Sequence, residues 1–332
     1  MRTGSARYVT ACFAAAALVL LAGCVQRKAT SVFVSPFSSQ VSENASGGRL
    51  VVLLITDNTD HQYPNRQPGS IADGVTKNAE LMETFIQRVH ASTGMAVDMH
   101  RIAGTTGIDD PFTCDNIVQT IKTLPVNAGD AVMVYYSGHG FNIGSDDPAT
   151  TASQIARFAS PDFGGHQLTQ FPFLACGRDV RNTPNLDLIA TWLAAKRPRL
   201  TIVMSDACNS FEAGTGPAAE SFFAGGTRAI TEDLRLRSLF VEARGTVLMT
   251  GSQRGHYSYY DTSFFHPGGF FTREFLTALE GIPASERTTW QDVGRLLTPM
   301  VVRVQDRRTA RITTDVQTPI LYVGDPFATA AR

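Results

Sequence analysis

The sequence predicts an α/β protein in which helices cover both faces of one open, mostly parallel sheet, forming three layers. Four apolar runs carry this prediction, because they are continuous rather than alternating and so are typical of strands buried on both faces: 49–56, 131–136, 200–204 and 246–250. Helical patterns separate the runs, which is the order of a parallel sheet with covered faces. The composition agrees, since 43% of the 332 residues are hydrophobic and 18% are charged.

The other elements follow from local patterns along the chain. Apolar residues recur at helical spacing in five segments: 71–92, 115–124, 186–196, 269–279 and 290–304. Two shorter apolar runs add one strand each: 96–101 and 320–323. No internal repeat is present and no linker follows residue 48. We therefore expect one domain over residues 49–325, with two long loops at 141–183 and 209–244.

The N-terminus has the features of a secretory signal. Two arginines precede a 13-residue apolar stretch at 11–23, which is too short for a bilayer span of about 20 residues. The stretch ends Leu21-Ala22-Gly23-Cys24, which resembles the bacterial lipobox, so residues 1–23 are predicted to be a lipoprotein signal peptide and Cys24 the lipidated residue. Val25 follows, rather than the Asp associated with inner-membrane retention. We expect a cell-envelope protein on the outer membrane, facing the periplasm, with residues 24–48 as a flexible tether.

Composition argues against several classes of partner and cofactor. With 29 basic and 30 acidic residues, the formal net charge is −1, and no basic field favours nucleic acid. Gly138, Gly140 and Gly144 lack the spacing of a dinucleotide-binding loop, and the seven histidines lack that of a zinc site. Five cysteines are too few for a disulfide framework. Cys114 and Cys176 could pair in an oxidising compartment, but this depends on a distance that the sequence does not give.

Two strand ends carry side chains suited to nucleophilic catalysis. His139 follows the second continuous run and is flanked by glycines that let backbone approach a ligand. Cys208 follows the third run, where a polar loop begins and a thiol can meet substrate and an imidazole. Residues i and i+2 share a face of a strand, so Ser137 should lie on the side of His139, and Asp206 on that of Cys208. Because sites in such sheets form at the carboxyl ends of strands, one cleft should hold all four.

At these residues the chain resembles the caspase and metacaspase family of cysteine peptidases, over roughly residues 49–324. Four motifs carry the resemblance: Tyr136-Ser137-Gly138-His139-Gly140, Asp206-Ala207-Cys208-Asn209-Ser210, Gly269-Phe270-Phe271-Thr272 and Gln317-Thr318-Pro319. The separation of His139 and Cys208 exceeds the roughly 50 residues of caspases, which an insertion at 141–170 explains. Asp-Ala-Cys is closer to metacaspases than to the caspase Gln-Ala-Cys. Asn209 stands where metacaspases often have His, and Lys77-Asn78 where the family has an Asn-Asp pair.

The resemblance implies a caspase-like fold and a Cys–His dyad that hydrolyses peptide bonds. Cys208 would attack the scissile carbonyl as a thiolate, and His139 would act as the base and then protonate the leaving amine. Backbone N–H groups of Gly140 and Cys208 would hold the oxyanion.

The resemblance also implies the substrate pocket. Asp206 would line the S1 pocket and select Arg or Lys at P1, with the hydroxyl of Ser137 as a further contact. From its position after the aromatic cluster at 257–260, Asp261 could supply a second wall, and plain packing of that cluster is the alternative. The alternative is that Asp206 only caps backbone N–H groups.

The loop after Cys208 predicts self-cleavage, as in caspases. Arg228, Arg235 and Arg237 are the candidate sites, because an enzyme that accepts Arg could cut its own mobile loop there. The alternative is a short amphipathic helix over 229–243 that shields the last two.

Two other functions stay open. One is a caspase-fold binding or scaffold protein with little turnover, and the other is a legumain-like peptidase that prefers Asn or Asp at P1. No metal or cofactor is predicted: Asp146-Asp147 resembles the acidic sites of calcium-dependent metacaspases, but two adjacent acids are usual in a solvated loop. The expected partners are a peptide or protein substrate and, through the lipid, a membrane.

Overall fold

The computed structural model describes residues 48–61, 70–144, 170–176, 183–211, 219–220, 233–261, 268–305 and 312–324. The predicted signal peptide and Cys24 lie outside these residues, as do Arg228 and Asp146-Asp147. Within the described ranges no helix combines the length and the apolar character that a membrane crossing requires.

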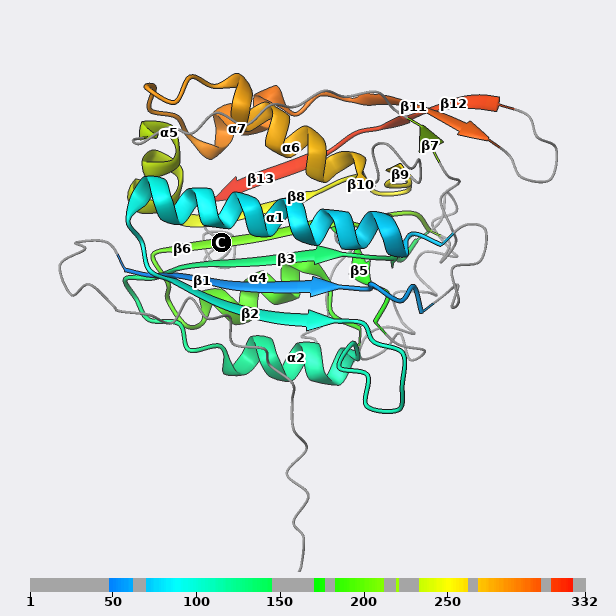
Figure 1. The fold of residues 1–332 in the computed structure, drawn as a ribbon, viewed down its shortest axis with the longest axis horizontal. Coiled ribbons are helices and arrows are strands. Elements are labelled where there is room, and N and C mark those ends of the chain that lie inside the picture. Colours follow the sequence, from blue (N-terminus) through cyan, green and yellow to red (C-terminus); the bar gives the residue numbers. More distant parts are fainter. Residues whose placement is uncertain are drawn as a thin grey trace, which may run out of the picture. The chain divides into compact units, whose positions relative to one another are not determined.

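The main sheet confirms the predicted mostly parallel α/β architecture. Its six strands lie in the order β13-β8-β6-β3-β1-β2. Five are parallel, and β13 pairs antiparallel with β8 at one edge, so its arrow points the opposite way in Figure 1. Their bounds are β1 Leu50–Thr56, β2 Val97–Ala103, β3 Ala131–Ser137, β6 Leu200–Asp206, β8 Gly245–Thr250 and β13 Ile320–Gly324.

Helices cover both faces of this sheet and complete the three layers (Figure 1). The helices that pack on one face are α1 Ala72–Thr93, α5 Leu234–Arg237, α6 Phe270–Gly281 and α7 Trp290–Leu296. Those on the other face are α2 Cys114–Thr123 and α4 Leu186–Ala194. Alternate residues of each strand enter the two cores: in β1, Val52 and Leu54 face α1, whereas Val51 and Leu53 face α2 and α4.

Two smaller sheets lie outside the main one. One has the order β10-β9-β7-β11-β12, with bounds Gly268–Gly269, Tyr260–Asp261, Ala219–Glu220, Met300–Gln305 and Ile312–Gln317. The other pairs β4, Gly140–Phe141, with β5, Phe173–Leu174. The second one matters for function, because β4 begins directly after His139.

The helix predicted over 290–304 is wrong in its second half. The helix α7 ends at Leu296 and β11 begins at Met300. Pro299 explains the change, because proline cannot continue a helix and drives the preceding residue to an extended conformation. The following run alternates between buried and exposed residues, as a strand does: Val302 is buried and Val301 is exposed.

Arg235 and Arg237, two of the arginines after which self-cleavage is predicted, lie in a helical segment, as the alternative expected. Both lie in α5, which continues as a π-helical turn over Ser238–Glu242. The Arg235 side chain is 2% exposed and forms an ion pair with Asp233, 2.6 Å from Nη2 to Oδ2. It also donates to the carbonyls of Leu279 and Ile282. A helical segment anchored in this way does not present an extended chain to a peptidase.

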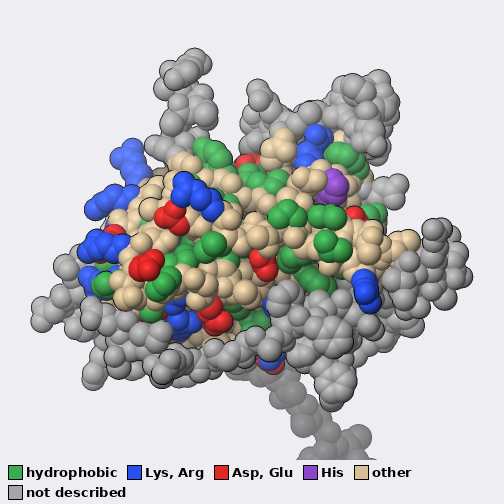
Figure 2. Space-filling model, turned by 90° about the horizontal axis from the view of Figure 1, so that it is seen from above, with side chains coloured by type: hydrophobic (Ala, Val, Ile, Leu, Met, Phe, Trp, Pro, Cys, Tyr) green, Lys and Arg blue, Asp and Glu red, His purple; other side chains and the backbone are tan. Residues whose placement is uncertain are grey.

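One face of the molecule shows how the charges are distributed. In Figure 2, seen from above Figure 1, basic and acidic side chains mix at the end of the molecule that carries α5, with hydrophobic side chains between them. Arg88 on α1 contacts both Asp233 and Glu280.

Arg235→Ala should destabilise the fold strongly. It leaves the buried Asp233 carboxylate without its closest cation, a loss that costs about 3–5 kcal/mol in comparable buried pairs. Urea unfolding followed by circular dichroism measures this. The matched control is Arg237→Ala in the same helix, which should change the free energy of unfolding by less than about 0.5 kcal/mol. Equal effects of the two variants would show that the ion pair does not stabilise α5.

Candidate active site

Three neighbouring strands end level with one another. The last residues of β1, β3 and β6 are Thr56, Ser137 and Asp206, and they are paired across the sheet, Thr56 with Ser137 and Ser137 with Asp206. Because the strands are parallel, the loops that follow them leave from the same edge. The residues that follow each strand, His139 and Cys208 among them, therefore begin at the same edge of the sheet.

The chain segments that carry His139 and Cys208 stay side by side beyond the strands. The N–H of Gly138 donates to the carbonyl of Asp206 at 3.4 Å, and the N–H of Asn142 donates to the carbonyl of Ser210 at 2.7 Å. One contact precedes both candidate catalytic residues and the other follows them. The two residues are thus held on adjacent, parallel segments of backbone.

Gly140 allows these segments to approach. A Cβ atom built at Gly140 would lie 2.5 Å from the carbonyl oxygen of Cys208 and 2.8 Å from the Cβ of Ala207. Both distances are far shorter than a carbon atom tolerates, so only glycine fits. The backbone of the predicted oxyanion residue Gly140 therefore packs directly against the backbone of Cys208.

Both candidate catalytic side chains are buried, with 3% of His139 and 4% of Cys208 exposed. The Cys208 thiol donates to the carbonyl of Ser258 at 3.3 Å, a bond that only the protonated sulfur can make. The Tyr136 hydroxyl donates to the carbonyl of His139 at 2.5 Å. Burial raises the pKa of Tyr136 well above its usual value, so this hydroxyl keeps the proton that it donates.

The His139 ring contacts a residue that the sequence analysis missed. Nε2 of His139 lies 2.9 Å from Oδ1 of Asp60, which follows β1 and is fully buried. Its other oxygen, Oδ2, accepts the N–H of Ile71 at 2.8 Å, at the start of α1. The signal available in the sequence was a polar run, Asp57-Asn58-Thr59-Asp60, after a third strand at the same edge of the sheet.

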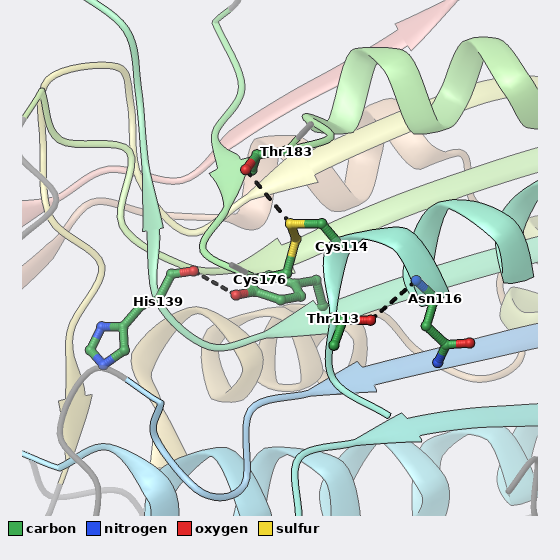
Figure 3. The surroundings of a disulfide bond; sticks show 7 residues. Thr113, Cys114, Asn116, His139, Cys176 and Thr183 are labelled. Atoms are coloured by element: carbon green, nitrogen blue, oxygen red, sulfur yellow. Dashed lines mark hydrogen bonds between the residues drawn. A yellow bond between two sulfur atoms is a disulfide. The ribbon is translucent and has the colours of Figure 1, made fainter. Parts of the chain in front are cut away.

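A disulfide supports the other side of His139. Cys114, the first residue of α2, bonds to Cys176, with their Cα atoms 5.0 Å apart, which answers the question that the sequence left open. Figure 3 shows His139 and this disulfide on neighbouring segments. Ala175, the residue before Cys176, donates its N–H to the carbonyl of His139 at 2.9 Å. The disulfide thus ties the segment that supports His139 to the start of α2.

Asp206 lies at the centre of a buried polar cluster and is fully inaccessible. Its Oδ2 accepts the N–H and the hydroxyl of Thr272, at 2.9 and 2.7 Å, and the side-chain amide of Asn78 at 3.2 Å. Its Oδ1 accepts the hydroxyl of Ser258 at 2.8 Å. Thr272 is in the first turn of α6, whose N-cap is Gly269, so Asp206 supplies the acceptor that the cap residue lacks.

Opposing effects act on the charge of Asp206. Burial raises the pKa of this carboxyl above its usual value, while the hydrogen bonds from Thr272, Ser258 and Asn78 lower it. Burial is the larger effect. The N-terminus of α6 also favours a negative charge at this position.

The other two predicted S1 residues belong to the same region. Ser137 accepts the amide of Asn78 at 3.1 Å, and its hydroxyl is 3.2 Å from that of Tyr260. Asp261 is fully buried and pairs with Arg273, 3.5 Å from Oδ2 to Nη1. Asn78, the position without a carboxylate, joins Ser137 to Asp206 and also accepts the N–H of Gly269 at 2.8 Å. Among the residues that the structure describes, no cluster of His, Cys, Asp and Glu could hold a metal ion.

Comparison with known proteins points to one family. The profile of the family described as "Caspase domain" matches residues 52–325. No curated protein matches the chain. Among solved structures, one titled "structure of pro-sf-caspase-1" is similar, with 10% sequence identity and a TM-score of 0.38 over 85% of this chain and 93% of that one.

Proposed function

The chain belongs to the caspase family, and from this premise we propose that it is a cysteine endopeptidase, with Cys208 as nucleophile and His139 as base. The observation that carries the proposal is the pair of contacts, Gly138 to Asp206 and Asn142 to Ser210, that hold the segments of His139 and Cys208 together. Caspase-family membership supports peptide hydrolysis in general, and the side-by-side segments support Cys208 and His139 as the residues that perform it.

The chemistry follows from these positions. His139 takes the thiol proton of Cys208, and the thiolate sulfur bonds to the scissile carbonyl carbon, whose π electrons move to oxygen. Backbone N–H groups of Gly140 and Cys208 stabilise that oxyanion, each worth roughly 3 kcal/mol in comparable sites. The C–N bond then breaks as His139 protonates the amine. Water, deprotonated by His139, releases the acyl group and regenerates the thiol.

We also propose a preference for Arg or Lys at P1, read by Asp206. Its support is the position of this buried carboxylate, two residues before Cys208 and beside Ser137. A cation would relieve the cost of burying the charge, and an arginine side chain would add directed hydrogen bonds. The four hydrogen bonds that Asp206 accepts from the protein favour the alternative, a purely structural role.

A second function has one specific observation in its favour. Cys208 is 4% exposed and its thiol is bonded to the carbonyl of Ser258, as expected for a resting or inactive thiol. A caspase-fold binding protein with little turnover is therefore the competing proposal.

For the cellular location of the protein, we propose a lipid anchor at Cys24 in the outer membrane, facing the periplasm. The lipobox-like sequence before Cys24 supports this proposal.

Cys208→Ala should abolish cleavage of fluorogenic peptides, and His139→Ala should lower kcat by about 10²–10⁴-fold, because the base and the leaving-group acid are lost. His90→Ala, a histidine on α1, is the control and should retain activity. Labelling by a thiol-directed peptide probe measures the same site without turnover. Labelling of the wild type with no cleavage of any P1 peptide would favour the binding protein.

Asp206→Asn should lower kcat/KM for P1-Arg and P1-Lys peptides more than for P1-Asp and P1-Asn peptides, by at least about tenfold, because a buried charge-assisted pair is lost. The control is Asp130→Asn, another buried carboxylate, which pairs with Arg49. It should lower thermal stability but keep the P1 preference. If Asp206→Asn behaves like the control, Asp206 is structural and the cation is read elsewhere.

Cys24→Ser should move the protein from the membrane fraction to the soluble fraction, because the lipid can no longer be attached. Its peptidase activity should match that of the wild type, because the proposed catalytic residues, His139 and Cys208, lie outside the tether. Fractionation followed by immunoblotting measures this. A variant that stays in the membrane fraction would overturn the anchor.

A further inference from the structure

The Asp60–His139 contact has a consequence for the proposed reaction. A neutral imidazole carries its proton on one ring nitrogen only, and the partner of that nitrogen decides which one. Nε2 of His139 lies 2.9 Å from a carboxylate oxygen of Asp60, and a carboxylate can only accept. With Asp60 ionised, the proton would lie on Nε2, and the lone pair that can take the proton of Cys208 would be on Nδ1.

Asp60 is held firmly enough to fix the imidazole. It is fully buried, and its backbone has a φ of 52°, a left-handed conformation that is uncommon for residues other than glycine. Its N–H donates to the carbonyl of Asp57 at 3.1 Å, closing a tight turn after β1. Its second oxygen accepts the N–H of Ile71 at 2.8 Å. A backbone turn and the start of α1 thus hold both ends of the residue.

The order of the strands places the starts of the loops that carry Cys208, His139 and Asp60 next to one another along the edge of the sheet. In the main sheet β3 lies between β6 and β1, so His139 follows the central strand, Cys208 follows the neighbour on one side and Asp60 the neighbour on the other. Other titratable groups around this edge include Asp57 and His61 in the same loop, Tyr136 on β3, and Tyr260, whose hydroxyl contacts the N–H of Gly138.

We propose that Asp60 is the positioning residue of a Cys208–His139–Asp60 triad: it orients the imidazole, keeps the proton on Nε2 and stabilises the imidazolium that forms when Cys208 ionises. This rests on the dyad of the proposed function. No further group is needed, because the proton that leaves Cys208 stays on Nδ1 until the leaving amine takes it, and Asp60 remains ionised throughout.

The test measures the ionisation of Cys208 without a peptide substrate. The rate of alkylation by iodoacetamide is followed from pH 5 to pH 10 in the full chain, with the Cys208 peptide quantified by mass spectrometry. Asp60→Asn should move the midpoint of this profile upward by about one pH unit, because an opposite charge near the imidazolium is lost. The peptidase kcat should fall by tenfold or more, while KM changes by less than about twofold.

The matched control is Asp57→Asn, a buried carboxylate of the same loop that binds the backbone and ring of His61 rather than His139. It should lower thermal stability and leave the alkylation midpoint of Cys208 where it is in the wild type. An unshifted midpoint in folded Asp60→Asn would overturn the triad. A shift there in a protein that cleaves no peptide would keep the triad and reject the peptidase.

A second measurement covers the case in which Asp60→Asn does not fold. The ring nitrogens of wild-type His139 can be observed by long-range proton–nitrogen correlation NMR at alkaline pH, with the signal assigned by its loss in His139→Gln. The triad requires the tautomer protonated at Nε2. Protonation at Nδ1 would overturn it.

Discussion

The in-register pairing of β1, β3 and β6 determines where each functional group lies. The loops that follow parallel strands all begin at the carboxyl edge of the sheet. Because β1, β3 and β6 end level with one another, at Thr56, Ser137 and Asp206, their three loops begin side by side. A shift of the register by one residue would turn every side chain of a strand to the opposite face. The two hydrophobic cores prevent this shift, because each strand residue already has an assigned side of the sheet.

The buried cluster around Asp206 couples the site to the packing of the helices. Desolvation makes a carboxylate at this position costly, and its four hydrogen bonds come from α1, α6 and the segment before β9. The stabilisation is mutual, since α6 begins at a glycine that cannot cap it, and a Cβ at Gly269 would lie 2.0 Å from Oδ2 of Asp206. Asp206 therefore offsets the free-energy cost of burying its carboxylate by accepting hydrogen bonds from the first turn of α6. Changes at Asp206 affect stability and pocket shape together.

The sequence predicted the sheet well because its signal is simple. Continuous apolar runs have few alternatives to buried parallel strands, and these runs led to β1, β3, β6 and β8 and to the strand ends that carry His139 and Cys208. It could not predict Asp60, because the position of that side chain depends on a left-handed turn that no local pattern announces. The pairing of Cys114 with Cys176 depended on a distance across the loop after β4. Asn78 was seen only as a departure from a family motif, and its three hydrogen bonds required the fold.

Gly140 restricts how a site of this kind can vary. Most tight positions in a protein face side chains, and a larger residue there can be accommodated by a smaller one opposite. At Gly140 the nearest atom is a main-chain oxygen, that of Cys208, and every amino acid has the same main chain. No second substitution can therefore restore the lost space. In laboratory evolution, Gly140 must therefore be retained. When this site is grafted onto another scaffold, His139, Gly140 and the backbone of Cys208 must be transferred together in the same relative positions.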